Sequence, residues 1–285
     1  MTDQSTPVPE WARIRVHTRR TYVALALFGA LGLFWLWHLA RSLADSRFVD
    51  GAFYVCASAA CAAVLWASVL VLKNRARSIA APGTADSVPG GVRFSTSRGL
   101  RVAYRMAMTF IAISSGLFAV GTWLGQFDFS MSSGQKLILP LAAAAVASYA
   151  VGALTWFAAG FLRYPGVEVS PDRLSTNGFR LKQTVTWDDV ADIVPLADGK
   201  NPEIDVVLKD RARAGVDIFY RGPFAPAYLQ AQRSVRITAD LFASGALPLL
   251  DFLDYYASSP DDRAELADGR ALRRLASMGQ PAADR

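Results

Sequence analysis

The chain has 285 residues, a formal net charge of +6 and a hydrophobic fraction of 52%, which leaves room for one ordinary domain beside a membrane bundle. The charge is divided unevenly: residues 1–161 hold 14 Lys and Arg against 6 Asp and Glu, whereas residues 162–285 hold 16 against 18. The excess of cations borders apolar segments and does not form a basic domain, which argues against nucleic-acid binding.

Residues 1–20 form a short polar segment, and four charge-free segments of 20 or more residues follow: 21–40, 51–72, 106–126 and 137–162. Each is long enough to cross a hydrocarbon core of about 30 Å at about 1.5 Å per residue. Short links join the first segment to the second and the third to the fourth. The sequence therefore predicts an α-helical membrane bundle of four transmembrane helices, arranged as two hairpins within residues 21–162.

Flanking cations predict the orientation of this bundle by the positive-inside rule. Only Arg41, Arg47 and Lys136 lie on one side, against eleven cations on the other. We expect a multi-pass protein of the plasma membrane, with both termini, the loop 73–105 and the C-terminal domain in the cytoplasm. A removable signal peptide is the alternative for the first segment, because Arg19 and Arg20 precede it in a loose twin-arginine pattern.

The loop 73–105 contains the candidate contacts to anionic lipid. Juxtamembrane cations attract anionic headgroups by about 1 kcal/mol each, although ordinary positive-inside bias also explains them. Residues 92–95 within the loop have an extended pattern, and we expect them to lie against the C-terminal sheet. The candidate lipid contacts are Lys73, Arg75, Arg77, Arg98, Arg101 and Arg105.

Two alternative functions concern the bundle itself. A small transporter or channel-like bundle with a regulatory cytoplasmic domain would need a polar path, and no Asp, Glu, Lys or Arg lies inside the predicted spans. A membrane enzyme would need His38, Asp45 and Asp50 to converge. Small residues recur every four positions at Ala144, Ser148 and Gly152, which suits helix contacts within the chain or between copies, so homo-oligomerisation stays open.

After residue 162 the hydrophobic pattern changes to that of short strands. Asn177-Gly178 predicts a two-residue hairpin turn, and turns recur every 8–12 residues, as in a small antiparallel sheet or partly open barrel. The predicted strands are 167–169, 179–187, 191–196, 203–208, 216–220 and 234–239. An amphipathic helix over 248–256 and a second helix over 260–278 follow, because Ser259-Pro260-Asp261 is a helix-start signal. Residues 279–285 are predicted to be frayed.

The pattern of strands followed by a covering helix resembles the bacterial pleckstrin-homology-like (PH-like) fold. The runs that carry the resemblance are Val-Glu-Val-Ser-Pro-Asp-Arg-Leu at 167–174 and Thr-Val-Thr-Trp-Asp-Asp-Val at 184–190. The closing pattern around 250–266 is similar to that of uncharacterised actinobacterial multi-pass membrane proteins. The resemblance covers about residues 162–275 and implies a mainly-β PH-like domain with C-terminal helices, over 163–278. It implies no catalytic residues, because the family has no agreed activity.

The residues themselves indicate little chemistry. The second half has no His or Cys, which excludes thiol catalysis, His-based acid–base catalysis and zinc sites with nitrogen or sulfur ligands there. We predict no catalytic residue, cofactor or metal. The candidate partner surface is Trp187, Asp188 and Asp189, although a core or rim tryptophan and two turn or cap residues are the simpler interpretation. We therefore expect a non-enzymatic membrane anchor whose cytoplasmic domain binds anionic lipid headgroups or a cytoplasmic protein.

Overall fold

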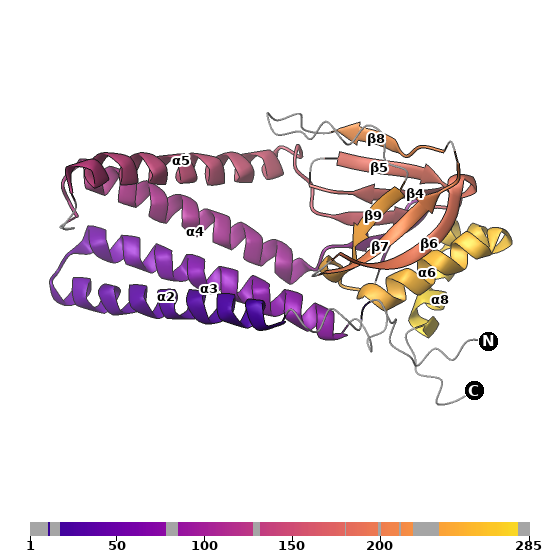
Figure 1. Cartoon of the computed structure of the whole chain (residues 1–285), viewed down its shortest axis with the longest axis horizontal. Coiled ribbons are helices and arrows are strands. Elements are labelled where there is room, and N and C mark those ends of the chain that lie inside the picture. Colours follow the sequence, from indigo (N-terminus) through magenta and orange to yellow (C-terminus); the bar gives the residue numbers. More distant parts are fainter. Residues whose placement is uncertain are drawn as a thin grey trace. The chain divides into compact units, whose positions relative to one another are not determined.

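The structure, a computed structural model, describes most of the chain and separates it into two compact units. The first unit is made of Met1–Thr18, Val71–Ser97 and Phe161–Arg285, and the second of Arg19–Leu70 and Arg98–Gly160. Figure 1 shows the helices and strands of both units along the chain. The predicted fray at 279–285 and most of the N-terminal segment lie outside the described residues, which are 11, 18–77, 85–127, 132–179, 181–198, 201–210, 212–218 and 234–278.

The second unit consists of long apolar helices, which confirms the prediction of four such helices. All four are long and apolar enough to cross a membrane. All four begin before their charge-free segments, because a helix continues through flanking polar residues, whereas α4 and α5 end at Trp123 and Ala158, before the predicted ends at 126 and 162. The last helix begins at a capping box between Ser132 and Gln135. The helices are α2 (Thr18–Ala44), α3 (Phe48–Arg77), α4 (Arg98–Trp123) and α5 (Ser133–Ala158).

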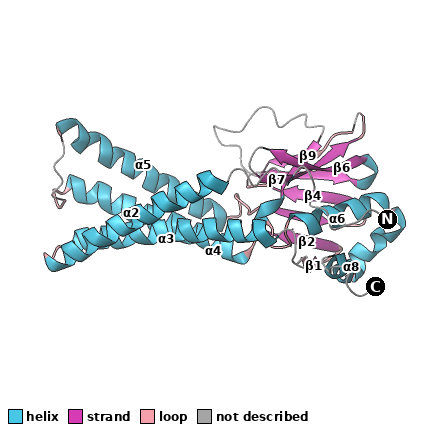
Figure 2. Cartoon of the chain, turned by 60° about the horizontal axis from the view of Figure 1, so that its bottom comes forward, coloured by secondary structure: helices cyan, strands magenta, loops and turns pink. Residues whose placement is uncertain are grey.

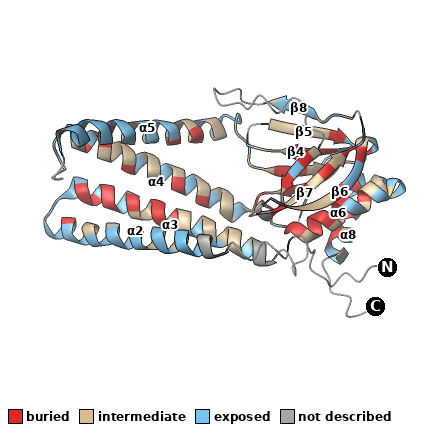
Figure 3. Cartoon of the chain, in the orientation of Figure 1, coloured by how far each residue is buried: buried red, intermediate tan, exposed pale blue. Residues whose placement is uncertain are grey.

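Small and aromatic side chains make the contacts between these helices. A Cβ at Gly32 of α2 would lie 3.5 Å from Cys61 of α3, and the rings of Phe53 in α3 and Phe118 in α4 are 5.7 Å apart. Along α5 the buried positions include alanines such as Ala150, whereas Ser148 of the predicted small-residue stripe is exposed. Most described residues of α2 are exposed or half-buried (Figure 3), as expected of a helix that meets lipid.

The first unit contains two antiparallel sheets, as Figure 2 shows. One has the strand order β1-β2-β3-β4-β5-β8 and the other the order β6-β7-β9. An antiparallel sheet region after the apolar helices was predicted and is confirmed. The strands are β1 (Asp86–Val88), β2 (Gly91–Ser95), β3 (Gly166–Val169), β4 (Arg173–Asn177), β5 (Leu181–Thr186), β6 (Val190–Asp198), β7 (Asn201–Leu208), β8 (Gly215–Ile218) and β9 (Ser234–Thr238).

Strand β2 precedes α4 in the chain but pairs with β3, which follows α5. Phe94 lies opposite Val167 and Ser95 opposite Gly166 in this ladder, and the Thr96 hydroxyl donates to the Pro165 carbonyl at 2.6 Å. Residues 92–95 are extended and lie against the C-terminal sheet, as expected, and they do so as a paired strand. The helix hairpin α4–α5 is inserted between two paired strands of one β unit.

The hydrophobic core of this unit lies between the sheets and the helix α6 (Ala246–Ser258). Phe94 of β2 is fully buried and meets Phe252 of α6 edge to face, with ring centroids 5.1 Å apart. Ile204 of β7 and Val235 of β9 contribute from the other sheet. Phe94, which precedes α4 in the chain, is therefore part of the same core as residues of the predicted domain 163–278.

Two local predictions differ from the structure. The Asn177-Gly178 turn is longer than two residues, since Asn177 pairs with Lys182 and the Gly178 amide donates to the Leu181 carbonyl at 2.8 Å. Gly178 does not adopt the positive φ that a tight primed turn requires.

The single helix predicted over 260–278 is wrong, because the chain turns at Gly269 with a φ of +78°. A residue in the left-handed region ends an α-helix, and the glycine permits that conformation without strain. Three short helices replace the predicted one: η5 (Pro260–Ala264), α7 (Glu265–Asp268) and α8 (Arg270–Met278).

Candidate functional site

Trp187 of the predicted partner surface belongs to the core. It starts η2 (Trp187–Asp189), the single 3-10 turn that joins β5 to β6. Its side chain is only 3% exposed, and the indole N–H donates to the Ser170 carbonyl at 2.8 Å. The Arg263 guanidinium lies 5.4 Å from the ring centroid. The indole is therefore covered, and a partner cannot contact it directly.

Asp188 and Asp189 have different roles although they are adjacent. The Asp189 carboxylate accepts a hydrogen bond from the Thr186 hydroxyl at 2.6 Å, so it fixes the turn. The Asp188 side chain is 95% exposed, and its nearest cation is Arg263 at 3.7 Å. Asp188 is thus the residue of the predicted group that a partner would meet.

Arg263 connects this turn to the end of α6. Its guanidinium donates to the carbonyls of Tyr256 and Ala257, at 2.9 and 3.2 Å. These are carbonyls of the last helical turn, which lack partners within the helix. The sequence did not single out Arg263, because the contact joins residues about 75 positions apart. At this corner, where the turn η2 meets the end of α6, the exposed Asp188 carboxylate is therefore paired with Arg263, whose side chain is only 14% exposed.

A polar network fixes the C-terminal helices. The Arg274 guanidinium donates to both carboxylate oxygens of Glu265, at 2.7 and 2.8 Å, and lies 4.4 Å from the Tyr255 ring centroid. The hydrogen bond from Arg274 lowers the pKa of Glu265. Burial raises the pKa of Tyr256, whose hydroxyl donates to Glu265 at 3.2 Å. Each of these groups has a partner within the C-terminal helices, so the network stabilises their packing.

An acidic group at the junction of α6 and β6 was not predicted. Burial, and then the neighbouring Asp254, raise the pKa of Asp251 to about 6. Burial, and then Asp192 of β6, raise the pKa of Asp254. Asp251 was missed because it lies within an apolar run.

Among the described residues there is no group of three or more His, Cys, Asp and Glu side chains that could hold a metal. His38, Asp45 and Asp50 therefore do not form a metal site.

The predicted lipid-contacting cations lie on the last turns of α3 and the first turns of α4. These two helix ends touch, since a Cβ at Gly99 would lie 3.0 Å from a Leu70 methyl group. The side chains of Lys73, Arg98 and Arg105 are exposed and that of Arg101 is half-buried. Arg75 and Arg77 are on α3, but their side chains lie outside the described set. Lys73 therefore lies in the last turns of α3, and Arg98, Arg101 and Arg105 lie in the first turns of α4.

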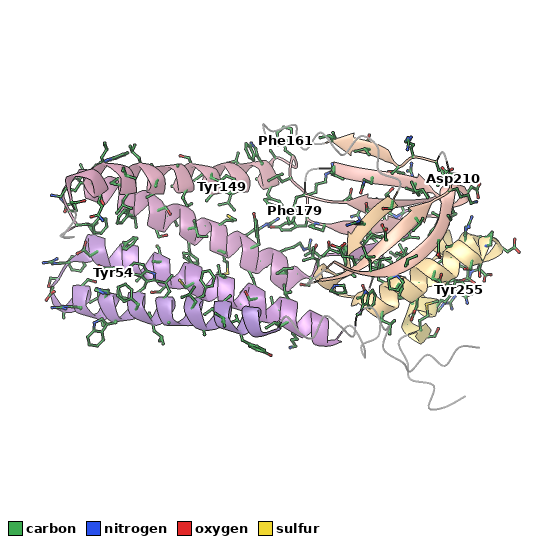
Figure 4. The ribbon with its side chains drawn as sticks, viewed as in Figure 1. Tyr54, Tyr149, Phe161, Phe179, Asp210 and Tyr255 are labelled. Carbon is green, nitrogen blue, oxygen red and sulfur yellow. The ribbon has the colours of Figure 1, made fainter. Side chains whose placement is uncertain are left out.

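At the opposite end of α2 and α3, aromatic rings surround His38. Its ring centroid lies 4.4 Å from that of Phe34 and 5.4 Å from that of Tyr54, the tyrosine labelled on α3 in Figure 4. Asp50, in the first turn of α3, is 7% exposed and lies 3.7 Å from Arg47. An acidic side chain in a first turn is favourable there because of the helix dipole. We therefore assign this group to helix packing.

Comparisons with protein-family models, with curated proteins and with solved structures found no match to this chain.

Proposed function

We propose that the chain is a non-enzymatic anchor of the plasma membrane, whose cytoplasmic PH-like domain binds a protein partner or anionic lipid headgroups. The observation that carries the proposal is the ladder between β2 and β3. Because of this ladder, β2 belongs to the folded β unit. In the chain, β1 and β2 follow the candidate membrane helix α3 and precede the candidate membrane helix α4. Only Thr96 and Ser97 separate β2 from α4, and two residues span about 7 Å at most.

The topology supports the part of the proposal that concerns orientation. The Trp11 indole donates to the Leu196 carbonyl at 3.1 Å, and two candidate spans separate Trp11 from β2. Two more separate β2 from β3. An even number of crossings returns the chain to the same side, so all parts of the β unit share one side. The excess of cations on that side argues for the cytoplasm.

The PH-like assignment is supported by the layout of the first unit. Two antiparallel sheets enclose a core against α6, and Trp187-Asp188-Asp189 forms the turn between the sheets. In this assignment β1 and β2 belong to the domain, so the proposed domain is larger than residues 163–278. The domain presents Asp188 as the exposed part of a partner surface.

Binding to anionic lipid is supported by the exposed cations in the last turns of α3 and the first turns of α4. We expect the triple variant Lys73→Gln, Arg98→Gln and Arg105→Gln to lose about 3 kcal/mol of attraction to anionic lipid, or about a hundredfold in partitioning. The matched control is Arg41→Gln with Lys136→Gln, at exposed positions of α2 and α5. Co-purified phospholipid, measured by mass spectrometry after mild solubilisation, is the readout. Equal phospholipid in both variants would remove this support.

A protein partner is tested by chemical cross-linking in native membranes. Asp188→Lys reverses an exposed charge at the corner, and Asp210→Lys is the control because Asp210, labelled in Figure 4, is exposed in another turn. We expect Asp188→Lys to remove at least one cross-linked species that Asp210→Lys retains. Identical profiles for wild type and both variants would count against a partner at this corner.

A further inference from the structure

Strand β6 is an edge of the sheet β6-β7-β9 in the described part of the chain. It spans nine residues, Val190–Asp198, which is long for an edge strand. Exposed edges of this length are ready templates for pairing with another chain, and proteins commonly blunt them. Features that hinder the pairing of β6 with another strand therefore show where the protein prevents such pairing.

Three features blunt this edge. The register shifts between Val190 and Asp192, which marks a bulge. Pro195 lies within the strand, and proline in a sheet is confined to edges and bulges. Next to Pro195, the Leu196 carbonyl accepts the hydrogen bond from the Trp11 indole. The first two features are local to β6, whereas the third comes from 185 residues away along the chain.

Trp11 is more than a hydrogen-bond donor at this position. Its side chain is half-buried and packs against the core of the β unit. A docked indole combines a large apolar contact with one directed polar group. Trp11 precedes the first candidate membrane helix, α2, by seven residues in the chain.

We propose that Trp11 is an intramolecular latch: it docks on the β6 edge at Leu196 and closes that edge to strand pairing with a second chain. Release of the indole frees a backbone carbonyl beside an apolar site, and an extended segment of another copy then adds to the edge. This inference goes beyond the proposed function and does not require an identified partner or lipid.

The docking part is tested on the full-length protein in detergent by hydrogen–deuterium exchange. Trp11→Ala is expected to raise exchange over residues 190–198 by about tenfold, a value set by one hydrogen bond plus partial indole burial. Trp37→Ala is the matched control, because Trp37 on α2 is 69% exposed. Unchanged exchange over residues 201–208 shows that the fold persists. Equal exchange of 190–198 in wild type and Trp11→Ala would overturn the latch.

The closing part is tested by self-association of the same variants. Trp11→Ala is expected to raise the cross-linked dimer fraction several-fold above wild type at equal protein concentration. Adding Leu196→Lys is expected to restore the wild-type fraction, because a lysine on an edge strand opposes pairing. A dimer fraction that stays at the wild-type value in Trp11→Ala would refute the closing role. So would a raised fraction that persists after Leu196→Lys, because the association would then use another surface.

Discussion

Replacing Phe94 by alanine tests whether the segment before α4 is part of the domain core. The Phe94 side chain is fully buried and packs against Phe252. Truncation of a buried phenylalanine typically costs about 3–5 kcal/mol, through lost transfer free energy and a residual cavity. A loss of this size is a large share of the stability of an ordinary domain, which is about 5–15 kcal/mol.

The readout is amide exchange in β7, at Ile204 and Val206, which lie in the other sheet. If these amides exchange by opening of the whole unit, Phe94→Ala should accelerate them by about a hundredfold to several thousandfold, at tenfold per 1.4 kcal/mol. The control is Phe179→Ala, since the Phe179 side chain is 45% exposed at the β4–β5 turn, where Figure 4 labels it. We expect it to change exchange less than threefold. Unchanged β7 exchange in Phe94→Ala would refute the inclusion of β2 in the core.

Three further predictions concern the same unit and are read by denaturant unfolding of the full-length protein, followed by exchange in β7. Gly91→Ala should destabilise the unit by about 1–3 kcal/mol, because its Cβ would lie 2.5 Å from a backbone carbonyl of β3. Gly215→Ala should cost less, since its closest contact would be 3.5 Å; equal losses would contradict the argument. Asp251→Asn should stabilise the unit at pH 7 by about 1 kcal/mol after solvent screening, because the folded-state pKa is raised to about 6 and the charged form is disfavoured. The wild-type protein should therefore lose stability as pH rises from about 4 through about 6, whereas Asp251→Asn should not. Asp261→Asn, at an exposed position, should behave as wild type. A wild-type stability that is flat over this pH range would refute the role of Asp251. Arg263→Met should cost about 1–3 kcal/mol by leaving two helix-end carbonyls without this donor, and a cost below about 0.5 kcal/mol would show that other donors replace it.

The sequence predicted the elements whose signal is local. Twenty or more uncharged residues are enough to identify a helix such as 51–72 as a candidate membrane span, and alternation is enough for strands such as 203–208. The end of a helix at Gly269 was missed because Pro260 and the following residues gave a strong start signal, while a single glycine is a weak stop signal. Local patterns therefore fix the element types better than their ends.

The site was less predictable, because its contacts join distant parts of the chain. Trp187 and Asp188 are adjacent in sequence, but only the packing of Arg263 over the indole shows that one is covered and the other exposed. The extended pattern at 92–95 indicated a segment that lies against the C-terminal sheet, whereas its pairing with β3 and its place in the core were not predicted. The contact between Trp11 and Leu196 has no local sequence signal at all.

The most direct test of the account is cysteine accessibility in cells, in a Cys56→Ala, Cys61→Ala background. Single cysteines at Ser87, in β1, and at Asp210, both exposed, should react with a membrane-impermeant maleimide only after permeabilisation. A cysteine at Asp45, between α2 and α3, should react in intact cells. The account would be contradicted if the cysteines at 87 and 210 were labelled in intact cells, or if one of them were labelled and the other were not. In either case the β unit would not lie as one domain on the cytoplasmic side of four membrane helices.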